Sequence, residues 1–410
     1  MNDKKTINNV FTLSFSGTAC TRDEGEVSRL KSDKRIYSER SGYIPVRVFR
    51  EINGVLTESD NAVSVRGSGE NDWAIPCDKS EDLLVSGPLK IPDSLSNYVK
   101  KYASGNQFSE AEQAEGKDIS ALALHGANKA VASGAKVVNM IGHSRGAVAA
   151  LMAAWFIYSY GNKDIQVNIF AIEPVPGPGN WWSTFTTLSP NVKHYAAIYA
   201  WDESIELSSD YLFTPVVPYP NEKMMEKKSC KASNSLWPFS NEWKNLGDKV
   251  LTPDPLGRST SPQPVHYDLY VCRGRHSTVS GNITTDSEYD PSKNSSKVAN
   301  VGDLIYLMAR TYLSHWGTIF SEPCAVTNTA KELRKAIVKY HDLFDVMGGG
   351  IYRTSRIYFR PYVRRIASGS GILSWNKLYM EDVVGDPPYE QYYPVTQERS
   401  GCSWVNWYFL

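Results

Sequence analysis

The sequence predicts an α/β fold built on a mainly parallel sheet with helices on both faces. Apolar runs of strand length alternate along the chain with runs of helical periodicity, which is the pattern of repeated strand-helix-strand units. A strand followed at once by a glycine-flanked turn and an alanine-rich helix lies within this pattern. With 410 residues the chain can bury a sizeable core in one large domain with insertions or in two domains.

The N-terminal third supplies the first elements of this pattern. Residues 8–18 are a short apolar-rich run that ends in small residues, which predicts a strand that stops at a loop. The region from 23 to 92 is polar and irregular, except for 43–52, for which we predict another strand. Residues 107–131 have helix formers and apolar side chains at a spacing near 3.6, and they immediately precede the predicted strand 135–143.

The middle of the chain continues the alternation. A helix is expected at 146–161, ended by Gly161. Three further apolar strands, spaced by loops and helices, indicate a mainly parallel sheet. These strands are 164–175, 192–204 and 265–277. Amphipathic helices are expected at 302–320 and 329–344.

One long segment does not fit the alternation. Residues 205–264 are rich in Pro, Trp, Lys and Asn without clear periodicity, and they are too many for a simple connection. We interpret them as an insertion that covers one end of the sheet. Residues 286–410 form a C-terminal helical and aromatic-rich extension, packed on the same domain or as a separate piece.

Charge and cysteine content exclude some classes of function. The chain has 44 basic and 44 acidic residues and no long basic run. The sequence therefore lacks the excess of positive charge that is typical of nucleic-acid-binding proteins. The six cysteines show neither CxxC pairs nor a histidine partner at metal spacing, which indicates no zinc site and no disulfide framework. We expect no cofactor, and nothing in the sequence indicates calcium.

No targeting segment is visible in the sequence. The N-terminus, MNDKKTINNV, has basic residues without a following apolar region, so a Sec-type signal is not indicated. No run of about 18 apolar residues is present that would span a bilayer. We expect the protein to be made in the cytoplasm. Export by a route that needs no cleaved signal peptide stays open.

The turn GHSRG at 142–146 is the strongest candidate for a reaction centre. A nucleophilic serine needs its Oγ raised out of the backbone path, and glycines two residues before and after it remove Cβ atoms that would collide. The helix that follows directs its N-terminal N–H groups toward the site. We therefore predict Ser144 as a nucleophile, with a structural tight turn as the alternative.

His276 is the predicted general base. The base is expected after the nucleophile and an acid along the chain, in a loop just after a late strand. His276 follows such a strand, in a Gly- and Ser-rich loop that lets the imidazole reach back. His266 precedes that strand, His315 falls inside a helical pattern, and the His143 side chain is expected to point away from the site.

Two carboxylates are candidates to orient the base. Glu173 ends one strand, where PVPGPG forces the chain out of the sheet, and Asp202 ends the next strand. Either could hold the imidazole in the right tautomer and stabilise the imidazolium that forms. Both have an acceptable chain order relative to Ser144 and His276, so the residues alone leave the two open.

An oxyanion hole needs two donors about 2.7–3.1 Å from the future oxyanion. One is expected to be the backbone N–H of Arg145, directly after the nucleophile. The other is expected from Gly17 or Ser16, at the end of the first strand, where small residues let the backbone approach. For the Arg145 side chain we expect a structural ion pair with Asp23 or Glu24 rather than substrate binding.

Five short segments carry a resemblance to a known family: FSGT (15–18), GHSRGA (142–147), AIEPVPGPG (171–179), AIYAWDES (197–204) and GRHSTVSG (274–281). They resemble a bacterial and fungal α/β-hydrolase domain family that includes type VI secretion lipase effectors. The family has FDGT, GFSRGA, FDTV, LDE and GxHSDVGG in the corresponding places. The resemblance covers roughly residues 10 to 285.

Carried over by position, the resemblance implies Ser144 as nucleophile, Glu173 as acid and His276 as base. This chain departs from the family in having Glu for Asp at the acid, Ser16 for Asp in the first segment, and STVSG for SDVGG. IEPVPGP is also similar to the segment that carries the acid in pancreatic-type lipases, which favours Glu173 over Asp202. The expected catalytic domain spans 8–285, with 205–264 as a cap or lid.

The expected reaction is cleavage of a carboxylic ester through an acyl-enzyme. Aromatic clusters and the 205–264 insertion indicate an apolar acyl pocket under a cap, and several of the rings could lie at a bilayer interface. These rings are Trp181, Trp182, Trp237 and Trp243. Basic runs at 221–231 and 361–370 could add attraction to anionic headgroups.

The resemblance implies a lipase or phospholipase that acts on lipid or membrane substrates as a secreted effector toxin. Its implied partners are a secretion-apparatus component and an immunity protein in the producing cell. A soluble carboxylesterase or thioesterase is the second hypothesis. A third is an inactive hydrolase fold used for binding, against which the intact serine, histidine and acid candidates argue.

Overall fold

The protein was analysed as a computed structural model of the 410-residue chain. The residues that it describes are 9–26, 35–53, 58–69, 87–103, 116–177, 183–200, 215–218, 220–225, 252–253, 266–283, 291–340, 343–344, 362–369, 379–385 and 407–409.

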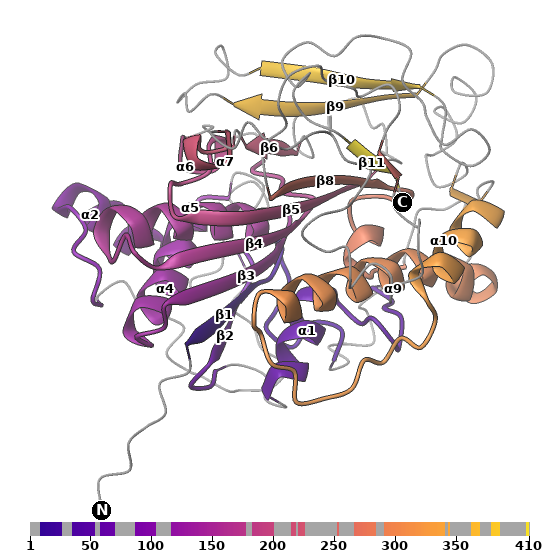
Figure 1. Ribbon diagram of the computed structural model, residues 1–410, viewed down its shortest axis with the longest axis horizontal. Coiled ribbons are helices and arrows are strands. Elements are labelled where there is room, and N and C mark those ends of the chain that lie inside the picture. Colours follow the sequence, from indigo (N-terminus) through magenta and orange to yellow (C-terminus); the bar gives the residue numbers. More distant parts are fainter. Residues whose placement is uncertain are drawn as a thin grey trace, which may run out of the picture.

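An eight-stranded sheet forms the centre of the molecule (Figure 1). Its strand order is β2-β1-β3-β4-β5-β8-β11-β7, and all neighbours pair in parallel except β11 and β7. The strands are β1 Val10–Phe15, β2 Ala62–Val65, β3 Val137–His143, β4 Gln166–Ile172, β5 Val192–Ala200, β7 Thr252–Pro253, β8 Tyr267–Cys272 and β11 Trp407–Phe409. The predicted α/β fold with a mainly parallel sheet is therefore confirmed.

A second sheet of three strands has the order β10-β9-β6. Its strands are β6 Val216–Pro218, β9 Tyr362–Gly369 and β10 Tyr379–Gly385. The strand β6 and the short helix α7, Glu222–Met225, belong to the predicted insertion at 205–264, as does β7. Most of that insertion lies outside the described residues.

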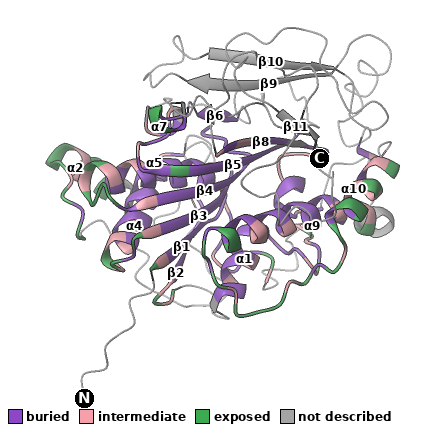
Figure 2. Cartoon of the chain, viewed as in Figure 1, coloured by how far each residue is buried: buried purple, intermediate pink, exposed green. Residues whose placement is uncertain are grey.

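Helices cover both faces of the large sheet, α4 and α5 on one side and α1, α9 and α10 on the other (Figure 1). The helices are α1 Ile44–Asn53, α2 Asp93–Ala103, α4 Ile119–Ala132, α5 Arg145–Tyr160, α6 Ser183–Thr186, α9 Pro291–His315 and α10 Ala330–Lys339. The strands between these layers are buried along most of their length (Figure 2). Among the described residues, no helix is both long and apolar enough to cross a membrane.

Side chains alternate along a strand, so those on its two faces pack in two separate hydrophobic cores. Phe11, Leu13 and Phe15 of β1 pack toward α4 and α5. Phe170 and Ile172 of β4 pack on the opposite side, in the core that contains α9. This alternation also decides which side chains at the strand ends can meet above each face.

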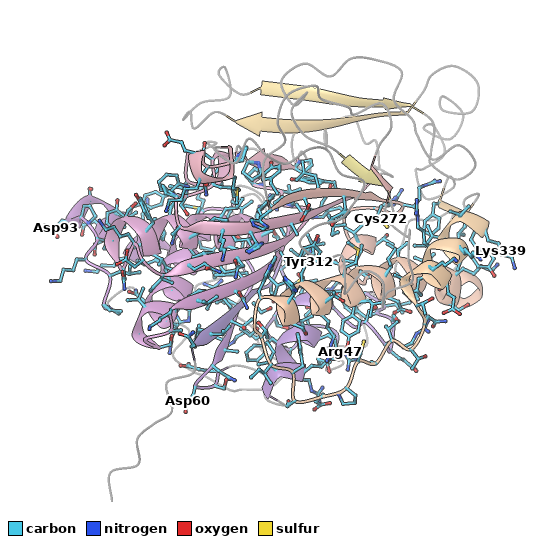
Figure 3. All side chains as sticks on the ribbon, viewed as in Figure 1. Arg47, Asp60, Asp93, Cys272, Tyr312 and Lys339 are labelled. Carbon is cyan, nitrogen blue, oxygen red and sulfur yellow. The ribbon has the colours of Figure 1, made fainter. Side chains whose placement is uncertain are left out.

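The helix α9 is part of the main core rather than of an appended piece. Leu304, Ile305 and Leu313 are fully buried together with residues of β3, β4 and β5. The side chain of Tyr312, a residue of α9, faces the sheet (Figure 3). Its hydroxyl donates a hydrogen bond to Asp268 Oδ2 at 3.2 Å and is also hydrogen-bonded to the Tyr270 hydroxyl. Helix α9, which follows the predicted boundary at residue 285, therefore packs in the same core as these strands.

Two predictions for the region 23–92 were wrong. Residues 43–52, predicted as a strand, form α1, whose side chains Ile44, Val48, Phe49 and Ile52 are buried at helical spacing. The region was otherwise expected to be irregular, yet it contributes β2, which pairs in parallel with β1. Burial against the sheet has overridden the β preference of valine and isoleucine in α1.

A row of polar side chains runs across the buried face that α9 covers. Thr12, Asn139 and Asn168 occupy aligned positions in β1, β3 and β4. Asn139 Oδ1 accepts from Asn168 Nδ2 at 2.8 Å, and Asn139 Nδ2 donates to Thr318 Oγ1 at 2.8 Å and to the Trp316 carbonyl at 3.2 Å. The row therefore attaches the chain that follows α9 to the centre of the sheet.

Asn139→Ala is expected to lower the free energy of unfolding by about 2 kcal/mol, because a buried polar group left without its partner costs about 1–3 kcal/mol. Urea denaturation would measure this change. The control is Glu58→Gln, which weakens the exposed Lys129–Glu58 pair and should cost less than about 1 kcal/mol. Equal losses in the two variants would contradict the proposed role of the polar row.

Candidate active site

Ser144 lies on a strained turn between β3 and α5. Its backbone has φ 55° and ψ −127°, a left-handed conformation that few residues other than glycine adopt. Its N–H donates to the Ile172 carbonyl at 3.0 Å, which ties the turn to the end of β4. The side chain is 2% exposed and projects beyond the carboxyl edge of the sheet, the edge at which open α/β sheets bind ligands.

The glycines around Ser144 permit this turn because three backbone segments meet there. A Cβ on Gly146 would lie 2.4 Å from the Ser16 carbonyl oxygen and 2.5 Å from that of Phe15. A Cβ on Gly142 would lie 2.6 Å from the Gly146 carbonyl oxygen. The first turn of α5 is thus in direct backbone contact with the end of β1.

His276 faces Ser144 across the end of the sheet. Its Nε2 lies 2.9 Å from Ser144 Oγ, which is hydrogen-bond distance. The loop after β8 that presents the ring contains Gly274 and Gly281 at φ 109° and 101°, with the 3₁₀ turn η1, Thr278–Ser280, between them. The structure therefore brings together two of the residues that the sequence predicted for the site.

The surroundings of His276 favour its neutral form. Desolvation of the ring is the main reason that its pKa lies well below 6.5, and the neighbouring His143 and Arg145 lower the pKa further. At pH 7 the imidazole is therefore uncharged. Only this form can accept the proton of Ser144.

The His143 side chain was predicted to point away from the site. In the structure it lies against His276 instead. Strand alternation places its ring on the α1 and α9 face, below the loop of His276. The two imidazole centroids lie 4.8 Å apart, and His143 Nε2 is 3.1 Å from the His276 carbonyl oxygen. Burial lowers the pKa of His143 to about 4, so this ring is also neutral at pH 7.

Glu173 follows the last residue of β4 and is completely buried. Its backbone has φ 43°, and its Oε2 accepts from the Ala200 N–H at 2.6 Å, at the end of β5. Its carboxylate is thus placed at the same sheet edge as Ser144. Asp202, the other predicted acid, lies outside the described residues.

The backbone donors of the β1 end differ from the prediction. The Ser16 N–H donates to the Val65 carbonyl at 3.0 Å, and the Gly17 N–H donates to the Tyr43 hydroxyl at 2.7 Å. Neither N–H is directed at the site, so the assignment of Gly17 or Ser16 to an oxyanion hole is corrected. Thr18 N–H, the next along the chain, has no acceptor among the described residues.

Arg145 is the first residue of α5, and N–H groups in the first helical turn have no acceptor within the helix. Its buried guanidinium donates from Nη1 to Thr18 Oγ1 at 2.8 Å. Burial lowers the pKa of Arg145 to about 10, which the charge of Asp118 partly opposes. The structure thus shows the Arg145 guanidinium in contact with Thr18 and Glu24 paired with Arg35, and the ion pair of Arg145 with Asp23 or Glu24 stays a prediction.

Thr18, Tyr43 and the role of His143 were not predicted from the sequence. Thr18 directly follows the predicted donor Gly17, so the FSGT segment contained a signal for it. Tyr43 carries none, because it is joined to His143 across 100 residues by the fold alone. The predicted interfacial rings Trp181, Trp182, Trp237 and Trp243 lie outside the described residues.

No group of three or more histidine, cysteine, aspartate or glutamate side chains suited to a metal ion occurs within the described part of the chain. The three cysteines described there, Cys20, Cys272 and Cys324, form no disulfide. The groups that the structure describes at this edge of the sheet include a serine, a neutral imidazole, the Glu173 carboxylate and backbone N–H groups.

Gly146→Ala is expected to destabilise the protein by about 1–3 kcal/mol, as overpacking does, although alanine is the better helix former by about 1 kcal/mol. The new Cβ would collide with two backbone carbonyls of β1, which cannot rotate away. The control is Gly134→Ala, where no atom lies within 4 Å and only the φ of 73° opposes the change. Thermal unfolding would measure both variants, and a stabilised Gly146→Ala would exclude the close contact.

Comparisons with known proteins provide little beyond this geometry. No family model matches the chain. No curated protein matches it. A solved structure of an uncharacterised protein from Pseudomonas aeruginosa is similar over 83% of this chain and 51% of its own length, with 12% sequence identity and a TM-score of 0.37. This chain thus spans about half of that protein, and a likeness at this level says nothing about function.

Proposed function

We propose that this protein is a serine hydrolase of the α/β-hydrolase type that cleaves carboxylic esters. The proposal is carried by one observation: Ser144 Oγ lies 2.9 Å from His276 Nε2 on a turn where Ser144 has φ 55°. A left-handed backbone at a residue other than glycine costs free energy, and such strain concentrates at functional sites. A serine in an ordinary tight turn would need neither this strain nor a histidine partner 132 residues away.

The proposed reaction uses His276 twice. As Ser144 Oγ attacks the ester carbonyl carbon, its proton passes to His276 Nε2. The imidazolium then gives this proton to the leaving alkoxide, and an acyl-enzyme remains on Ser144. Water then attacks the acyl group and loses a proton to the same nitrogen, which gives it to the departing Ser144 Oγ, so that the carboxylic acid and the free serine are formed.

In this proposal the backbone N–H groups of Arg145 and Thr18 stabilise the oxyanion. Arg145 N–H directly follows the nucleophile at the start of α5, where the helix dipole favours negative charge. Thr18 N–H replaces the predicted donor Gly17, whose N–H is bonded to Tyr43. The hydrogen bond between Arg145 and Thr18 Oγ1 would keep the two donors at a fixed separation.

A carboxylate is required because burial and Arg145 both disfavour the imidazolium that His276 must form. Glu173 and Asp202 remain the two candidates. Glu173 is favoured by the resemblance to lipase sequences and by its burial beside the turn. Asp202 follows the next strand, two residues beyond the end of β5.

The proposed substrate is a lipid ester, so that the enzyme would be a lipase or phospholipase. This step and the role as a secreted effector with an immunity protein rest on the resemblance of the sequence motifs. A soluble carboxylesterase or thioesterase is the alternative within the same chemistry. A binding protein that has lost catalysis is disfavoured by the contact between Ser144 and His276.

A fluorophosphonate probe is expected to label the wild-type protein and to fail on Ser144→Ala. His276→Ala should label more slowly by roughly 10²- to 10⁴-fold, the usual contribution of a general base. His315→Gln is the control, because His315 lies at the exposed end of α9. Gel fluorescence with intact-mass analysis would measure the labelling, and a folded wild type that resists the probe would remove Ser144 as the nucleophile.

The same proteins distinguish the substrate classes. Fatty-acid release from phosphatidylethanolamine and phosphatidylglycerol vesicles by the wild type alone would support the lipase proposal. Turnover of p-nitrophenyl butyrate with intact vesicles would favour the soluble esterase instead.

Glu173→Gln and Asp202→Asn are expected to identify the acid. Glutamine in place of Glu173 keeps a side-chain oxygen that can accept from Ala200 N–H, so the variant loses the charge without losing this contact. The variant of the true acid should lose roughly 10²- to 10⁴-fold in kcat for p-nitrophenyl butyrate, as a wrongly oriented imidazole does. The other variant serves as its matched control, and full activity in both would exclude both carboxylates.

A further inference from the structure

A chain of hydrogen bonds joins the end of β1 to the loop of His276. Gly17 N–H donates to the Tyr43 hydroxyl at 2.7 Å. The Tyr43 hydroxyl lies 3.0 Å from His143 Nδ1, and His143 Nε2 lies 3.1 Å from the His276 carbonyl oxygen. Two side chains therefore connect the two segments that would supply the oxyanion donor and the base.

The chemistry of its two ends fixes the direction of this chain. A backbone N–H can only donate and a carbonyl oxygen can only accept. The Tyr43 hydroxyl therefore accepts from Gly17 and donates to His143 Nδ1, and His143 donates from Nε2–H to His276. Burial keeps both groups in the required state, because it raises the pKa of Tyr43 well above 10 and lowers that of His143 to about 4.

Backbone contacts support the same connection. Ile283 N–H, at the end of the His276 loop, donates to the Ile36 carbonyl at 2.8 Å. The segment between Ile36 and Tyr43 also contains Gly42, and a Cβ on Gly281 would lie 2.0 Å from the Gly42 carbonyl oxygen. The loop of the base thus packs directly on the segment that carries Tyr43.

One end of the chain holds the peptide that precedes Thr18, and the other end holds His276, whose ring faces Ser144. The bond to Tyr43 fixes the Gly17 peptide, and the following N–H belongs to Thr18. The bond from His143 fixes the His276 carbonyl, and the His143 ring, tilted by 36° at a centroid distance of 4.8 Å, lies against the ring that faces Ser144. The donor and the base cannot then move independently of each other.

We propose that Tyr43 and His143 are positioning residues that set the oxyanion donor of Thr18 and the base His276 at a fixed separation on either side of Ser144. This inference rests on the proposed ester hydrolysis. Neither side chain touches the reacting atoms, so both act through the backbone that they hold. Loss of either side chain should lower kcat rather than raise KM, because displaced catalytic groups stabilise the transition state less well.

Tyr43→Phe tests the first link and Tyr37→Phe is its matched control. Tyr37 packs edge-on against Tyr43 at 5.7 Å, but its hydroxyl donates to Glu24 rather than to the chain. With p-nitrophenyl butyrate, Tyr43→Phe is expected to lose roughly 10- to 100-fold in kcat at unchanged KM, as small displacements of catalytic groups do. Tyr37→Phe should retain wild-type kcat, and equal kcat values in the two variants would overturn the inference.

His143→Phe and His143→Gln test the second link. Phenylalanine keeps an aromatic ring without a donor, whereas glutamine can place an amide N–H near the His276 carbonyl. His143→Gln should therefore recover much of the kcat lost in His143→Phe. A structural role alone would affect both variants through thermal stability and leave kcat of the folded fraction unchanged, which would overturn the inference.

A measurement that does not depend on turnover separates this inference from the proposed function. In ¹⁵N spectra of histidine-labelled protein, His143 should be the Nε2–H tautomer, and Tyr43→Phe should shift the signals of both His143 and His276. Tyr37→Phe should leave them in place. If Ser144 proves unreactive, the proposed function fails, and unchanged His276 signals in Tyr43→Phe would overturn the connection itself.

Discussion

The direct backbone contact between the first turn of α5 and the end of β1 is the constraint on which the site depends. With glycine at 146, the helix approaches the Phe15 and Ser16 carbonyls more closely than any side chain would permit. Ser144, two residues before Gly146, has a left-handed backbone conformation in the same turn. The segment after β1 also reaches the start of α5, where Thr18 Oγ1 accepts from Arg145 Nη1 at 2.8 Å.

Much of the fold could be predicted from the sequence because its central strands are continuous apolar runs between turn residues. The β3 strand, the turn at 142–146 and the α5 helix are local features, so their pattern suffices. The α1 helix could not be predicted, since its valines and isoleucine favour a strand and only packing on the sheet decides otherwise. The β2 strand is short and lies among polar residues, so its pairing with β1 leaves no signal in its own sequence.

The residues of the site that belong to short sequence motifs could be predicted. Ser144 and His276 follow from a turn and a loop of recognisable composition. His143 was misplaced because its direction depends on which face of β3 it occupies and on what lies there. Gly17 was misassigned because the acceptor of its N–H comes from Tyr43, a residue with no motif around it. Such partners are set by tertiary structure, which one sequence does not display.

The polar row beneath α9 has a consequence for how the chain acquires its structure. Thr12 Oγ1 is hydrogen-bonded to Thr318 Oγ1 at 3.0 Å, and these residues lie 306 positions apart in the sequence. During synthesis the first strand therefore leaves the ribosome long before the segment that completes its buried face. Contacts of such sequence separation slow folding, and unpaired apolar strands are prone to aggregate while they wait. A chain shortened before residue 318 would lack this closure, so early termination should yield an aggregation-prone intermediate rather than a smaller folded protein.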